Sequence, residues 1–130
     1  MPHQVLSVGQ CGMDHGSISR LIEGRFDASV AAAATARQAL DLLRGGEYQL
    51  VLVNRLFDQD GGSGLEFLRQ LKQNPAMAAV PMMLVTNYPD VQAQAVAVGA
   101  LAGFGKNDLT APQTVEKLAA VLGDRVKAKS

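Results

Sequence analysis

Short apolar runs alternate along this chain with longer segments in which apolar residues recur every three or four positions. The clearest run is residues 50–53, which is rich in β-branched residues and gives way at Asn54 to a polar, glycine-rich loop. After the loop, apolar residues return at helical spacing, at Leu65, Phe67, Leu68 and Leu71. This stretch therefore predicts a strand, a loop and a helix, with Asn54 at the carboxyl edge of the strand.

The same pattern predicts four more strand and helix units. Strands are expected at residues 4–9, 26–34, 80–87 and 100–106, and a fourth helix from Pro89 to Gly99. The buried stripes of the other helices are Ile18, Leu21 and Ile22, then Ala39, Leu42 and Leu43, and last Val115, Leu118, Ala119 and Leu122.

Polar residues and glycines mark where these helices begin and end. The expected N-caps are Asp14 or Ser17 for the first helix, Thr35 with Gln38 for the second, and Thr110 with Gln113 for the last, with Pro112 in its first turn. Glycines at 24, 45 and 46 are expected to end the first two helices.

Five strands that alternate with five helices predict an α/β fold, a doubly wound parallel sheet with helices on both faces. Ligands of such sheets bind at the carboxyl ends of the strands. The residues expected there are Gly9, Gln10, Asn54, Thr86 and Lys106.

Composition limits what such a sheet could do. With 130 residues, 48% of them apolar, the chain is expected to be a single domain with a core at about 4–122 and a polar tail at 123–130. The 12 basic and 12 acidic residues balance, so no nucleic-acid partner is expected. No apolar run reaches the ~20 residues of a membrane span, and no signal peptide is evident, which favours a cytoplasmic protein. Cys11, the single cysteine, excludes an internal disulfide and is expected to be a bystander rather than a reactive thiol.

Several motifs together resemble the receiver domain of bacterial two-component response regulators, over residues 4 to about 122. They are "YQLVLVN" through the third strand, "GLEFLRQLK" in the third helix, "PMMLVT", and "VGA" followed by a lysine seven residues after Gly99. The resemblance implies a flavodoxin-like (βα)5 fold with strand order 2-1-3-4-5. It also implies a pocket in which two acids after the first strand bind Mg²⁺, an aspartate after the third accepts a phosphoryl group, and a hydroxyl residue and a lysine end the fourth and fifth strands.

The pocket of this chain departs from that pattern at its acidic positions. Thr86 and Lys106 match the hydroxyl residue and the lysine, but Gly9 and Gln10 replace the paired acids, and Asn54 replaces the phosphoacceptor. A carboxamide is no nucleophile at neutral pH, and Mg²⁺ prefers carboxylate ligands. We therefore expect no phosphorylation of Asn54 and no metal site, with Lys106 hydrogen-bonded to the Asn54 carbonyl as a remnant.

Other departures concern the loop and the signalling face. The loop "DQDGGSG" is about two residues longer than the family pattern and places Asp58 where a proline is usual. Gly103 stands at the aromatic switch position, one residue before Phe104. Because Gly103 has no side chain to move, we expect a face fixed in one conformation.

These features favour a phosphorylation-independent, pseudo-receiver module without cofactor, not an enzyme, that binds a signalling protein or an output domain. The expected docking residues are Tyr88, Val91, Ala95 and Phe104, although Phe104 is also a candidate core residue.

Two other functions stay open. Asp58 or another loop carboxylate such as Asp60 is an alternative phosphoacceptor, and a small flavodoxin-like ligand-binding module is the third interpretation. Against a nucleotide ligand, the glycines at 9, 12 and 16 do not have the spacing of a dinucleotide-binding loop. The loop "GGSG" could cradle an anion through its backbone N–H groups. His3 and His15 are too isolated to form a metal site. The partner, the oligomeric state and the extent of the full gene product also stay open.

Overall fold

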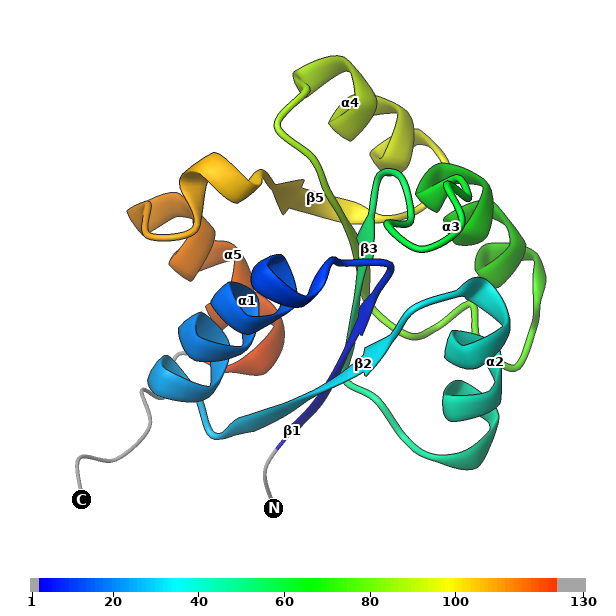
Figure 1. Ribbon diagram of the computed structural model, residues 1–130, viewed down its shortest axis with the longest axis horizontal. Coiled ribbons are helices and arrows are strands. Elements are labelled where there is room, and N and C mark those ends of the chain that lie inside the picture. The colour runs from blue at the N-terminus through cyan, green and yellow to red at the C-terminus, as the bar shows by residue number, and fades with distance from the viewer. Residues whose placement is uncertain (1–2, 124–130) are drawn as a thin grey trace.

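A single parallel sheet organises the computed structural model, which describes residues 3–123 (Figure 1). Its five strands lie in the order β2-β1-β3-β4-β5, and every pairing between neighbouring strands is parallel. The strands are β1 (His3–Val8), β2 (Ala28–Ala33), β3 (Leu50–Asn54), β4 (Met82–Val85) and β5 (Leu101–Phe104). The helices are α1 (Gly12–Arg25), α2 (Ala36–Gly45), α3 (Gly64–Gln73), α4 (Pro89–Ala97) and α5 (Pro112–Leu122), with a short 3₁₀ helix, η1 (Lys106–Asp108). The predicted doubly wound sheet and its strand order are confirmed.

Side chains of each strand alternate between two cores, one on each face of the sheet. Val51 and Val53 of β3 pack with α2, α3 and α4 on one face, whereas Leu50 and Leu52 pack with α1 and α5 on the other. Figure 1 shows the same division, with α1 and α5 on one side of the sheet and the other three helices opposite. Burial on both faces explains why β3 is apolar along its length before Asn54.

The helix ends differ from the sequence prediction at two of the three predicted caps. Cys11, and neither Asp14 nor Ser17, caps α1, because its Sγ accepts a hydrogen bond from the backbone N–H of Asp14. The Thr35 cap of α2 is confirmed. Thr110 does not cap α5, because the residue before the helix is Ala111, whose side chain has no oxygen to accept a hydrogen bond, and Pro112 takes the first position.

Other boundaries moved by a few residues. Helix α1 continues through Gly24, and α4 ends at Ala97, two residues before Gly99. Strand β5 ends at Phe104, so Lys106 belongs to η1 and not to the strand. Leu42, predicted to be buried, is 37% exposed, whereas Ala39 is the fully buried residue of α2. Residues 124–130 of the predicted tail lie outside the described residues.

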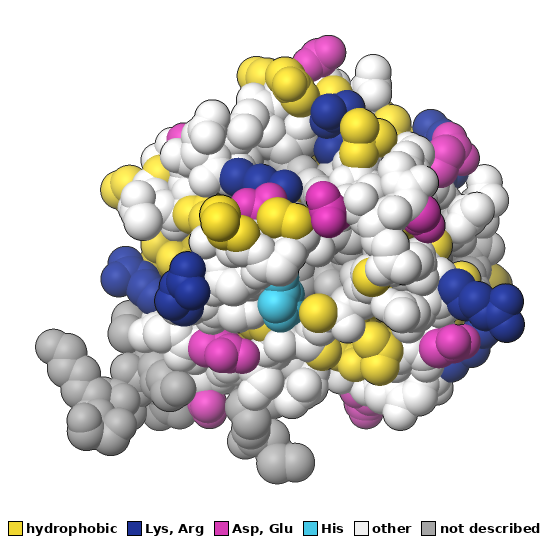
Figure 2. Space-filling view, in the orientation of Figure 1, with side chains coloured by type: hydrophobic (Ala, Val, Ile, Leu, Met, Phe, Trp, Pro, Cys, Tyr) yellow, Lys and Arg dark blue, Asp and Glu magenta, His cyan; other side chains and the backbone are white. Residues whose placement is uncertain are grey.

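The surface carries no broad field of one charge on the face shown in Figure 2, where basic and acidic side chains are interspersed. Hydrophobic side chains gather near the top of that view, where Figure 1 places α4. Within residues 3–123, no helix has the length and apolar character that crossing a membrane requires.

Candidate functional site

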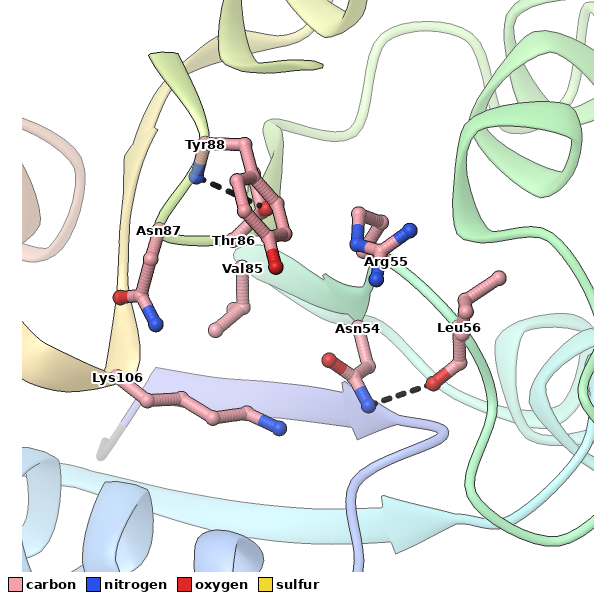
Figure 3. A pocket seen from close by; sticks show the side chains of 8 residues that line it. All are labelled: Asn54, Arg55, Leu56, Val85, Thr86, Asn87, Tyr88 and Lys106. Carbon is pink, nitrogen blue, oxygen red and sulfur yellow. Dashed lines mark hydrogen bonds between the residues drawn. The ribbon is translucent and has the colours of Figure 1, made fainter.

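A cavity of about 260 Å³ opens at the carboxyl edge of the sheet, between the ends of β3, β4 and β5 (Figure 3). Three of the five predicted site residues meet there, Asn54, Thr86 and Lys106. The remaining lining residues are Arg55, Leu56, Val85, Asn87 and Tyr88. Gly9 and Gln10 follow β1 and do not line this cavity.

The side-chain amide of Asn54 is held in one orientation by two backbone carbonyls. Its Nδ2 donates to the carbonyl oxygen of Gly9 at 3.1 Å and to that of Leu56 at 2.7 Å. Only the NH₂ end of the amide can donate to carbonyl oxygens, so Oδ1 is left on the cavity side (Figure 3). Asn54 thus presents an acceptor, and no nucleophile, to the cavity.

The predicted contact between Lys106 and the Asn54 carbonyl is wrong. Lys106 Nζ instead forms an ion pair with Asp14 Oδ2, at 2.6 Å. Asp14 lies in the first turn of α1, and the hydrogen bond from Lys106 is the main reason that the pKa of its carboxyl lies below the usual value, opposed by partial burial. Asp14 was predicted only as a cap of α1, although its place shortly after β1 is a signal that could have linked it to the lysine.

Position 9, at this edge of the sheet, has no room for a side chain and therefore requires glycine. Its φ of +77° lies in the region that favours glycine, and an added Cβ would come within 2.3 Å of Phe57 Cδ1. Phe57 is 3% exposed and packs edge-to-face on Phe67. Any side chain at position 9 would therefore have to displace a core aromatic ring.

Comparison with known proteins supplies structural neighbours only. No family model and no curated protein matches the chain. A response regulator from Thermotoga maritima superimposes with a TM-score of 0.76 at 17% identity, over 94% of this chain and 98% of that one. The chemotaxis response regulator CheY4 of Vibrio cholerae superimposes with a TM-score of 0.70 at 20% identity, over 94% and 100%. This chain has the receiver-domain fold.

The share of the neighbour's chain that this fold occupies differs from one neighbour to another. NtrX from Brucella abortus superimposes with a TM-score of 0.75 at 18% identity, over 94% of this chain but only 27% of NtrX. The receiver fold thus occurs both in chains of this length and as one part of a longer protein.

The loop after β3 closes over itself and keeps its two aspartates outside the cavity. Phe57 N–H donates to Gly62 O, and Asp60 Oδ1 accepts from Gly62 N–H. Asp58 is exposed, and neither aspartate lines the cavity. The geometry does not favour Asp58 as a phosphoacceptor beside Thr86 and Lys106.

The Mg²⁺ site of the receiver fold does not fit the residues present. Within residues 3–123, no three His, Cys, Asp or Glu side chains form a group that could hold a metal ion. Gly9 supplies no side-chain ligand, and the buried amide of Gln10 has no hydrogen-bond partner among the described residues. The Asp14 carboxylate is already paired with Lys106.

Gln92 of α4 is a functional candidate that the sequence analysis missed. Its Nε2 donates to Leu84 O at 2.8 Å, and its Oε1 accepts from Gly103 N–H at 2.9 Å, so it joins α4 to β4 and β5. A Cβ on Gly103 would lie 2.2 Å from Leu84 O, so the position of the receiver aromatic is closed to side chains. No hydrophobic pattern marks such an amide.

The predicted docking residues divide into two groups. Tyr88 is 55% exposed and Val91 is half-buried, so both contribute to the surface near α4. Ala95 and Phe104 are buried, at 0% and 3% exposure, in the cores beneath that surface. The prediction of Ala95 as a docking residue is therefore wrong, and for Phe104 the core alternative is confirmed.

Proposed function

We propose that this chain is a pseudo-receiver, a signalling module that binds a protein partner without being phosphorylated at Asn54. The observation that carries the proposal is the orientation of the Asn54 amide, whose nitrogen is bound to two backbone carbonyls. A receiver needs a carboxylate oxygen in this place to attack a phosphodonor. The group that faces the cavity here is a neutral carbonyl oxygen.

The surroundings of Asn54 support the same proposal. Phosphoryl transfer requires a metal ion or other cations that neutralise the negative charge of the transition state. Here Lys106 is already paired with Asp14, and Gly9 and Gln10, directly after β1, offer no carboxylate. The proposal therefore includes no enzymatic activity, and it places the module in the cytoplasm, in keeping with its composition.

The proposed docking surface is the α4–β5 face, which we define by Tyr88, Val91, Val96 and Leu101. Tyr88, Val96 and Leu101 are 55%, 46% and 43% exposed. Tyrosine is enriched among the residues that anchor protein interfaces, and the exposed apolar side chains beside it add area that a partner can bury. Because Gln92 joins α4 to the strand ends beneath, the face is held in one arrangement and should bind its partner constitutively.

Phosphorylation is tested by incubating the protein with acetyl phosphate and Mg²⁺ and measuring its intact mass. The proposal expects no mass increase. A phosphorylated peptide containing Asp58 would instead support the alternative phosphoacceptor, and any phosphorylated carboxylate would overturn phosphorylation independence.

Partner binding is tested with variants of the exposed residues only. Tyr88→Ala, Val96→Glu and Leu101→Glu should each reduce recovery of bound proteins, whereas Leu42→Glu, on the exposed side of α2, is the control. Recovery that survives all three changes but is lost when residues 58–62 are altered would place the interface on the loop after β3.

A further inference from the structure

A second cavity, of about 290 Å³, lies at the amino edge of the sheet, the edge opposite to Asn54. It opens between the connection from α2 to β3 and the connection from α3 to β4. Its apolar wall is formed by Leu43, Met77 and Val80, of which Met77 is only 5% exposed. The proposed docking residues lie elsewhere, so a ligand in this cavity is independent of the proposed signalling role.

An aromatic residue stands beside this apolar wall. Tyr48 lines the cavity and is half-buried against the core that α2, α3 and α4 cover. Gly46 leaves part of its ring uncovered, because a Cβ at position 46 would lie 3.6 Å from Tyr48 Cε2, at ordinary contact distance. The electron-rich face of such a ring attracts cations.

The charge at this cavity is negative. Glu47 lines it, is exposed, and forms no hydrogen bond or ion pair within residues 3–123. Helix α2 ends next to it, at Gly45. The partial negative charge at the C-terminus of a helix favours a cation and adds to the charge of the carboxylate.

Two basic side chains of the adjoining helices are engaged elsewhere. Arg44 pairs with Asp41 at 3.6 Å, and Lys72 Nζ donates to Ala78 O at 2.9 Å. Neither of them lines the cavity. A ligand that enters therefore meets an apolar wall, an aromatic ring and a carboxylate whose charge no basic side chain of the cavity neutralises.

We propose that this cavity binds a small organic cation, an ammonium group that carries alkyl substituents. The alkyl groups pack on the apolar wall, and the positive charge lies between the Tyr48 ring and the Glu47 carboxylate. An inorganic cation cannot use the apolar wall, and a neutral molecule gains nothing from the carboxylate. The volume is near the lower end of the range of ligand pockets, which limits the ligand to a small one.

The test is an amide chemical-shift titration of the full chain with choline, whose trimethylammonium group is the probe, at an ionic strength held constant with sodium chloride. Saturating shifts are expected at Gly46, Glu47, Tyr48 and Met77. The neutral analogue, in which a tert-butyl group replaces the trimethylammonium group, should bind at least about tenfold more weakly, a difference of ~1.4 kcal/mol. Ammonium chloride should produce no saturating shifts at these residues, because it has no alkyl surface to bury.

Three outcomes of these titrations would overturn the proposal. Equal binding of the neutral analogue would show that the cavity selects apolar surface without regard to charge. Saturation by ammonium chloride would show that it attracts any cation. Choline shifts that do not saturate, or that saturate only at residues outside the cavity, would show that the cavity is not the binding site.

Two variants of equal charge change show whether the charge effect is local. Glu47→Gln should weaken choline binding about fivefold, the effect of one charge removed at a few ångströms in water. Glu116→Gln, at an exposed position of α5, should leave it unchanged. Both positions are exposed, so both variants should fold, and equal effects of the two would contradict a role for Glu47.

A third variant fills the cavity without changing its charge. Gly46→Val places a side chain beside the Tyr48 ring, and the extended backbone at position 46, with a φ of −157°, accepts valine. It should weaken binding of choline and of the neutral analogue alike, and undiminished choline binding would place the ligand outside this cavity. Choline donates no phosphoryl group, so these outcomes are independent of the acetyl phosphate experiment.

Discussion

Lys106 Nζ lies 2.6 Å from Asp14 Oδ2, which ties η1, just after β5, to the first turn of α1. These two elements are far apart in the sequence, and the ion pair joins them beyond the carboxyl ends of β1 and β5. Both side chains are about one-third exposed, so the pair is partly screened by solvent. The lysine that would face a phosphoryl group in a receiver is thus engaged by a carboxylate of this chain.

Asp14→Asn should lower the free energy of unfolding at pH 7 by roughly 0.2–1 kcal/mol, the range of partly exposed ion pairs. The folded protein lowers the pKa of Asp14, so the stabilisation is present above the unfolded value of 3.8 and is lost as pH falls through the lower folded value. The difference between wild type and variant should therefore shrink below about pH 4. Urea unfolding at several pH values measures this difference in the free energy of unfolding.

The control for this prediction is Asp41→Asn. Asp41 pairs with Arg44 at 3.6 Å on an exposed part of α2, so its loss should have a smaller effect. A difference for Asp14→Asn that stays constant from pH 7 to pH 3 would contradict the role assigned to the ion pair.

The hydrophobic pattern predicted the alternation of strands and helices, whereas the strand order was implied by the family resemblance. Residues 50–53 are buried on both faces, and Asn54 ends the run where the cavity begins. The convergence of Asn54, Thr86 and Lys106 also followed, because the carboxyl ends of parallel strands share one edge.

Other features of the site depend on contacts that leave no sequence pattern. Asp14 lies inside the first turn of α1, because the helix starts at Gly12, about one turn before it would start if Asp14 were its cap. From that position Asp14 pairs with Lys106. Gln92 is one of several polar residues on α4, and only the three-dimensional approach of α4 to β5 distinguishes it. The burial of Ala95 and Phe104 likewise depends on how α4 and β5 turn their side chains into the cores.

Gln92→Ala should destabilise the protein by about 1–3 kcal/mol, because it leaves the Gly103 N–H and the Leu84 carbonyl without their side-chain partner. Hydrogen exchange at the Gly103 amide should accelerate in the same variant. Gln94→Ala, at an exposed position of the same helix, is the control and should change stability by less than about 0.5 kcal/mol. Equal effects of the two variants would show that Gln92 does not hold α4 to the strands.

Gly103→Ala should destabilise the protein by about 1–3 kcal/mol, since its Cβ would lie 2.2 Å from Leu84 O and the backbone would have to move. Gly24→Ala is the matched control, because nothing lies within 4 Å of a Cβ at that helical position. It should instead stabilise by up to about 1 kcal/mol. The melting temperatures of the two variants should therefore shift in opposite directions. A Gly103→Ala variant of unchanged melting temperature would show that position 103 has room for a side chain.

Asn54→Asp should not restore phosphorylation and should weaken the fold at neutral pH. The new carboxylate would place an oxygen where Nδ2 now donates to Gly9 O and Leu56 O, so two hydrogen bonds become two contacts between acceptors. We expect a loss of about 2–4 kcal/mol at pH 7.

The pH dependence identifies the cause of that loss. Repulsion by the carbonyls should raise the pKa of the introduced carboxyl, so the destabilisation should diminish as pH falls below the raised value and the group becomes protonated. Asn107→Asp makes the same charge change on an exposed residue of η1 and should show no comparable dependence. Ready phosphorylation of Asn54→Asp by acetyl phosphate would show that one carboxylate is enough in this pocket. Phosphorylation would then not require acids at Gly9 and Gln10, because the variant would accept the phosphoryl group although an acid at position 9 stays blocked by Phe57.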